Sequence, residues 1–116
     1  MPTHSSRLLA LCALLWLPAA LAADLGWLTG RWEMTYDPDD NPKDWVEFKA
    51  SGEVVSIAHD GKHVPGRYTV AGDEIQVTFN VDGTEVPLTL RCSADKSRLT
   101  LPARQSAGFS LYAKMR

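Results

Sequence analysis

Apolar and polar residues alternate with a period of two along most of the chain after residue 30. Successive side chains on a β-strand point to opposite faces, so this alternation predicts strands that bury one side. The clearest case is Glu74–Val81, where every second residue is apolar. Eight such segments follow one another. The residues expected to face inward include Trp32, Met34, Val55, Ile57, Leu99, Leu101, Phe109 and Leu111.

Turn residues separate the predicted strands. Asp60-Gly61 and Asp82-Gly83 are strong signals for two-residue hairpin turns, which require positive φ angles. Successive hairpins place neighbouring strands side by side and antiparallel, and closing eight short strands on themselves removes the exposed edges. The sequence therefore predicts an all-β domain over residues 23–116, an eight-stranded antiparallel up-and-down barrel. Pro87 interrupts one strand and indicates an edge, a bulge or incomplete closure there.

The segment 24–29 lies outside this alternation. Asp24 is a good helix N-cap, and Leu25 and Leu28 are three residues apart, which is typical of one helical turn. We expect a short N-terminal helical turn that covers one end of the barrel with Trp27 or Leu28.

Residues 1–22 are typical of a secretory signal peptide. Arg7 is their only charged residue, an apolar run follows, and Ala20-Leu21-Ala22 supplies the small residues that a signal peptidase recognises. The run is too short for a stable membrane span. Cys12 lies inside the apolar run after Leu11, which does not fit lipoprotein processing. We therefore expect a periplasmic or secreted protein with no membrane span after cleavage.

Composition narrows the classes of function. The chain has a formal net charge of −2, which becomes −3 once Arg7 is removed with the leader. An acidic domain with no basic stripe is not expected to bind nucleic acid. Cys92 is the only cysteine left after cleavage, so no intramolecular disulfide forms. It lies on the apolar face of a predicted strand, where a small buried hydrophobic residue is the first interpretation and a reactive thiol the alternative.

One short motif points to a family. Trp27-Leu28, followed by Gly30-Arg31-Trp32-Glu33, resembles the W-L-x-G-x-W-E start of short bacterial lipocalin-like domains in the calycin superfamily. The resemblance implies that the tryptophan packs across the closed end of a barrel, under a basic residue from the last strand. Lys114 and Arg116 are the candidates for that residue. It also implies a small apolar ligand inside the barrel.

Five aromatic residues are the candidates for lining such a ligand site: Tyr36, Phe48, Tyr68, Phe79 and Phe109. All five are expected to point inward, where core packing is the alternative role. An eight-stranded barrel either is filled by its own side chains or holds one small ligand, and the short strands here favour a filled interior. Trp45 is expected to point outward, where it anchors a protein partner or folds under the adjacent loop.

Candidate metal sites and catalytic groups are weak. His59 and His63 flank one hairpin turn, but zinc normally requires three or four protein ligands. The run Asp37, Asp39, Asn41 and Asp44 resembles the start of a calcium loop, but Pro42 replaces the required glycine and Phe48 the twelfth-position glutamate. No nucleophile motif is present. We therefore expect no metal, no cofactor and no enzymatic activity.

The sequence leaves two functional interpretations. The first is an exported, non-catalytic lipocalin-like protein that binds a small apolar ligand. The alternative is a protein-interaction module with a filled barrel, which acts as an inhibitor or accessory of an envelope enzyme.

Overall fold

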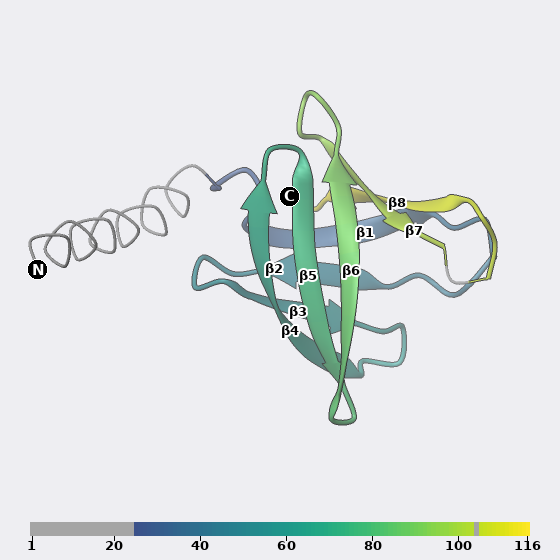
Figure 1. Cartoon of the computed structure of the whole chain (residues 1–116). Helices are drawn as coiled ribbons and strands as arrows, with labels where there is room; N and C mark the ends of the chain where they lie inside the picture. Colours follow the sequence, from purple (N-terminus) through teal and green to yellow (C-terminus); the bar gives the residue numbers. More distant parts are fainter. Residues whose placement is uncertain (1–24, 104) are drawn as a thin grey trace, which may run out of the picture.

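The computed structural model describes residues 25–103 and 105–116, so the predicted leader and Asp24 lie outside the described residues. Eight antiparallel strands close into one barrel in sequence order, as predicted, and the last strand pairs with the first. Figure 1 shows this arrangement. The strands are β1 (Gly30–Tyr36), β2 (Trp45–Phe48), β3 (Glu53–Ile57), β4 (His63–Ala71), β5 (Glu74–Val81), β6 (Thr84–Cys92), β7 (Arg98–Pro102) and β8 (Phe109–Lys114). No helix in the described part of the chain is long and apolar enough to span a bilayer.

One end of the barrel is closed by the segment that precedes β1. Leu28 and Trp32 are both completely buried, and the Trp32 Nε1 donates a 2.8 Å hydrogen bond to the Leu28 carbonyl. The Leu28 amide in turn bonds the Leu25 carbonyl at 2.9 Å, which makes a hydrogen-bonded turn. No helix is assigned to this segment in the described residues. The Lys114 Nζ donates to the Trp27 carbonyl at 2.8 Å, so the last strand fastens this turn onto the barrel.

A β-bulge in β1 overturns the predicted orientation of Tyr36. The register of β1 with β8 shifts between Met34 and Tyr36, so Tyr36 pairs with Leu111. A bulge inserts one extra residue and breaks the two-residue period. Tyr36 therefore lies on the outer face and is 54% exposed, where strict alternation predicted an inward side chain.

The predicted inward face of β8 is also wrong. Ser110 and Tyr112 are buried and face the interior, whereas Phe109 and Leu111 lie on the outer face. The alternation in this strand was assigned by choosing its more apolar set of positions. The structure instead buries the polar Ser110 because a hydrogen-bond partner, the carboxylate of Asp37, lies within reach at 3.0 Å. A buried hydroxyl that is hydrogen-bonded escapes most of its desolvation penalty.

The phase of β3 is reversed as well. Val54 pairs with Phe48 and is completely buried in the core. Ile57, expected to face inward, pairs with Trp45 on the outer side of the sheet. Val54 and Val55 are adjacent, so the sequence pattern alone did not distinguish the two faces of this short strand.

Proline positions explain where the ladders stop. The Cys92 amide bonds the Asp73 carbonyl, which fixes the phase of the β5–β6 ladder. Backbone groups alternate between the two neighbours, so the even-numbered residues of β6 bond β5 and the odd-numbered ones face β7. Pairing of β6 with β7 covers only Arg91 with Thr100 and Cys92 with Leu99. The next bonded position would set Thr89 opposite Pro102, which has no N–H to donate.

On the other side of the β5–β6 hairpin, the pairing of β5 with β4 also ends at a proline. Pairing of β4 with β5 runs from Ala71 to Gly66, opposite Phe79, and the next position would set Pro65 opposite Asn80. Gly66 is required at the last pair, because a Cβ there would lie 2.6 Å from the Thr78 carbonyl oxygen. The outer half of the hairpin is therefore paired only with itself, and Figure 1 shows its tip extending beyond the other strands. This geometry confirms that Pro87 marks a free edge.

Truncation of Leu28 tests the closed end. We expect Leu28→Ala to lower the free energy of unfolding by about 2–5 kcal/mol, because it leaves a cavity in the core cluster to which the completely buried Leu28 belongs. Leu25→Ala is the matched control, since the half-buried Leu25 only packs against the edge of the core. Urea denaturation of both variants checks the prediction, and equal losses would contradict it.

Hydrogen exchange tests the phase of β6. The amides of Leu88 and Leu90 face β5, whereas the amide of Thr89 faces the side where the β6–β7 pairing has stopped. We expect the Thr89 amide to exchange roughly tenfold faster or more than those two neighbours, because its opening requires no unfolding of a ladder. Equal protection of all three amides in an NMR exchange experiment would contradict this assignment.

Candidate functional site

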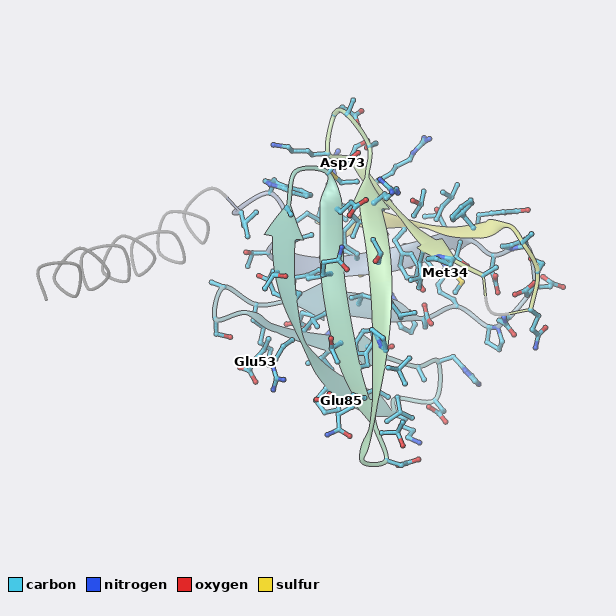
Figure 2. All side chains as sticks on the ribbon, in the orientation of Figure 1. Met34, Glu53, Asp73 and Glu85 are labelled. Carbon is cyan, nitrogen blue, oxygen red and sulfur yellow. The ribbon has the colours of Figure 1, made fainter. Side chains whose placement is uncertain are left out.

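The end of the barrel opposite Leu28 forms an open mouth, bordered by the loops 37–44 and 58–62. Residues 105–108 lie against the loop 37–44 there. A hollow of about 220 Å³ opens there, with Met34 and Leu101 among its apolar lining residues. Figure 2 shows Met34 on the side of the barrel where the loop 37–44 lies. The polar residues that line the hollow are Asp37, Asn41, Asp44, His59, Ser110 and Tyr112. The hollow is smaller than the roughly 300–1,000 Å³ typical of sites for drug-sized ligands.

The carboxylates of the mouth accept hydrogen bonds from neighbouring groups of the protein. Asp37 accepts hydrogen bonds from the Asn41 amide at 2.8 Å and from the Ser110 hydroxyl at 3.0 Å. The Tyr112 hydroxyl donates to Asp44 at 2.6 Å. The Gln105 amide donates to Asp39 at 2.8 Å, which ties the loop 103–108 to the loop 37–44. These bonds hold the two loops in place, so the carboxylates have a structural role at the mouth.

The pKa of Asp37 reflects this bonding. Partial burial raises the pKa of its carboxyl, but hydrogen bonds from the Asn41 and Asp39 amides and from the Ser110 hydroxyl together lower it below the usual value. Bonds to the ionised form favour that form. Asp37 therefore stays a carboxylate at neutral pH.

The five aromatic candidates divide into two groups. Phe48, Tyr68 and Phe79 are buried in the core, as predicted, and the rings of Phe48 and Tyr68 pack edge to face at 5.1 Å. Tyr36 and Phe109 are 54% exposed on the outside, so the prediction that they point inward is wrong. None of the five lines the hollow at the mouth.

The two exposed aromatic residues belong to one face. Across the ladders, Tyr36 pairs with Leu111 and Phe109 pairs with Pro102, and paired side chains lie side by side. We call these four residues the outer aromatic face. Contiguous exposed apolar side chains of this kind mark interaction surfaces more often than scattered ones do.

A second hollow borders the outer aromatic face where β6 and β7 separate. It has a volume of about 270 Å³ and is lined by Glu74, Thr89, Arg91, Thr100, Pro102 and Phe109. We call it the seam hollow. One wall is apolar, from Phe109 and Pro102, and the other is polar, where Arg91 forms a 2.6 Å ion pair with Glu74.

Trp45 points outward, as predicted, but it is half-buried. It pairs with Glu33 on β1 and with Ile57 on β3. Ile57 is 7% exposed although it lies outside the core cluster, which indicates that neighbouring outer side chains cover it. Much of the Trp45 ring is therefore engaged with its own sheet.

The proposed metal arrangements receive no support from the geometry. His63 pairs with Ile57 rather than with His59, because β3 ends before the turn, so the two imidazoles do not face each other. In residues 25–103 and 105–116 no group of three or more His, Cys, Asp or Glu side chains is placed to hold a metal ion. The carboxylate of Asp37, a candidate calcium ligand, accepts hydrogen bonds from its own loop.

Sequence reasoning missed the outer aromatic face and the buried Ser110. The bulge leaves no local signal in the alternation of β1. In the run Phe109-Ser110-Leu111-Tyr112, the more polar pair is the one that is buried. Ser110 and Tyr112 make long-range hydrogen bonds to the loop 37–44, which no local pattern reveals.

Comparison with known proteins adds no constraint: no family model, curated protein or solved structure matches this chain.

Removal of the Ser110 hydroxyl tests the bonding at the mouth. We expect Ser110→Ala to raise the pKa of Asp37, because one bond that favours the carboxylate is lost. A lowered folded-state pKa contributes stability above the unfolded value and loses it as pH falls through the folded value, so the variant should lose this contribution at a higher pH. NMR titration of the Asp37 carboxyl carbon checks the shift, and an unchanged pKa would contradict it.

Proposed function

We propose that this protein is an exported, non-catalytic protein-interaction module with a filled, lipocalin-like barrel. It binds an envelope or secreted protein through the outer aromatic face. The observation that carries the proposal is the exposure of Tyr36 and Phe109, each 54%, on one side of the barrel. Five other aromatic residues are buried: Trp32, Phe48, Tyr68, Phe79 and Tyr112.

The packing of the interior supports this choice. Phe48, Val54 and Val77 are nearly or completely buried in one continuous core cluster. Small-molecule sites are concave, and most of the ligand surface is buried in them. The mouth hollow of about 220 Å³ fits only a compact ligand, and its carboxylates Asp37 and Asp44 already accept hydrogen bonds from the protein. A small apolar ligand inside the barrel is therefore the less favoured alternative.

The shape of the outer aromatic face also supports a protein partner. Tyrosine and phenylalanine offer large contact areas, and aromatic residues are enriched in the centres of protein interfaces. The bulge that turns Tyr36 outward costs the core one aromatic side chain. The leader-like residues 1–22 and the W-L-x-G-x-W-E start support the export and the lipocalin-like class that we propose.

Site-specific crosslinking tests the proposal. A photoreactive phenylalanine analogue at position 36 should crosslink one protein from an extract of the cell envelope. The analogue at Ser51, in the exposed turn between β2 and β3, should not. The partner is then purified and its affinity measured directly by calorimetry. We expect Tyr36→Ser with Phe109→Ser to weaken binding by about 30-fold or more, because central aromatic anchors each contribute above 1 kcal/mol.

Controls separate this face from the rest of the surface. Trp45→Ala tests the other residue considered as an anchor for a partner, and we expect it to change the affinity for the partner by less than threefold. Circular dichroism verifies that each variant is folded. Equal binding by the wild type and the Tyr36→Ser, Phe109→Ser variant would overturn the proposal. Saturable uptake of a fluorescent apolar probe at one site per chain would favour the ligand-binding alternative.

A further inference from the structure

The outer half of β6 is a free strand edge with a vacant neighbouring position. Pairing with β7 ends at Arg91, so Glu85, Pro87 and Thr89 have no registered partner strand on that side within the described residues. By alternation, the carbonyls of all three and the amides of Glu85 and Thr89 point into this space. Figure 1 shows the lower half of β6, which begins at the hairpin tip, lying apart from β7.

The described residues that follow β7, Ala103 and Gln105 among them, make their hydrogen bonds away from that space. If β7 were extended in register, residues 103–106 would lie opposite β6. Instead the Ala103 amide bonds the Gly108 carbonyl at 3.0 Å, and the Gln105 amide bonds Asp39 at 2.8 Å. Both contacts direct the loop toward β8 and the mouth. The place of about five strand residues beside β6 is thereby left open.

We propose that an extended, basic segment of a partner protein adds to this edge as a strand antiparallel to β6. This inference rests on the proposed function and specifies how the partner is held. Strand addition uses main-chain hydrogen bonds for affinity and adjacent pockets for specificity. The seam hollow is that pocket, since it is lined by Thr89 on the free edge and by Phe109 of the outer aromatic face.

The register follows from the positions of the free groups. A residue opposite Thr89 and one opposite Glu85 each exchange two hydrogen bonds with β6, whereas the residue between them only donates to the Pro87 carbonyl. The side chain opposite Thr89 points to the outer face and enters the seam hollow beside Phe109 and Pro102. The partner therefore presents an apolar residue there.

Charge selects the other end of the segment. Residues 79–90 include Asp82 and Glu85 and no lysine or arginine. The Glu85 side chain is 70% exposed, and its ion pair with Arg67 is long, at 3.9 Å. Figure 2 shows Glu85 toward the end of the hairpin. Opposite charges on directly paired residues stabilise a sheet, so the residue opposite Glu85 is lysine or arginine.

A second copy of this chain fits the edge less well. Symmetric pairing would set Pro87 against its own copy, so neither could donate at the centre. It would also bring together two hairpin ends whose residues 79–90 carry only acidic charge. A basic segment meets neither obstacle.

A synthetic peptide tests the inference on the mature protein. The probe is fluorescein-labelled Gly-Phe-Val-Thr-Val-Lys-Gly, in which phenylalanine is to lie opposite Thr89 and lysine opposite Glu85. We expect saturable binding by fluorescence anisotropy, with new exchange protection of the Thr89 amide. A peptide with glutamate in place of the lysine, and one methylated on the amide nitrogen of the central threonine, should each bind at least fivefold more weakly.

Two substitutions change the edge in opposite directions. Pro87→Thr supplies a missing donor, so it should tighten peptide binding about threefold to tenfold. Thr89→Pro removes a donor and should weaken binding at least fivefold, whereas Thr89→Val keeps that donor and should stay within twofold. Thermal melts establish that each variant is folded.

The outcomes distinguish this inference from the proposed function. It is overturned if neither the wild type nor the Pro87→Thr variant binds the peptide saturably, or if sedimentation shows that the protein pairs with itself through this edge. It is also overturned if the crosslinked partner binds the Thr89→Pro and Thr89→Val variants equally. In that last case a loss of affinity in the Tyr36→Ser, Phe109→Ser variant would leave the proposed function standing. Conversely, peptide binding that follows the Thr89 substitutions without any partner at position 36 would support strand addition and count against the outer aromatic face.

Discussion

Closure of the hydrogen-bonded ladder is the constraint on which the rest of this molecule depends. Every strand is paired on both sides over part of its length, and this lets a short chain satisfy its backbone groups around a small core. The ladder stops where a proline occupies a position that would have to donate. At Pro65 the pairing of β4 with β5 ends, and at Pro102 the pairing of β6 with β7 ends. Pro87 lies on the unpaired side of β6, where an N–H group would have no partner strand to donate to. The exceptions to closure thus have a definite chemical cause.

Much of the fold was predictable from the sequence, and the reasons are local. Turn chemistry at Asp60-Gly61 and Asp82-Gly83 separates the strands, and the alternation in Glu74–Val81 fixes its buried face. Up-and-down order follows because short hairpins allow little else. The interruption of strand pairing at Pro87 was also predictable, because the missing N–H group is a property of that one residue.

The candidate site was much less predictable, because its positions are set by distant contacts. The outward orientation of Tyr36 depends on a bulge in the pairing of β1 with β8. The burial of Ser110 depends on the carboxylate of Asp37, which is 73 residues away in the sequence. Both effects arise only once the barrel has closed. The pattern in β8 failed because polarity was treated as exposure, whereas a bonded hydroxyl can be buried at little cost. Three of the predicted aromatics are packing residues, and the two with wrongly assigned orientation form the surface of greatest interest.

The attachment of Lys114 to the turn before β1 has a consequence for how the molecule is displayed. The described chain enters the barrel at Leu25 and leaves it after Lys114 at the same end, and the Met115 amide bonds the Arg31 carbonyl at 2.8 Å. A tether fixed to either terminus would pull on that one end. The opposite end, with the β5–β6 hairpin and its neighbouring loops, would point away from the anchor and be accessible to other molecules.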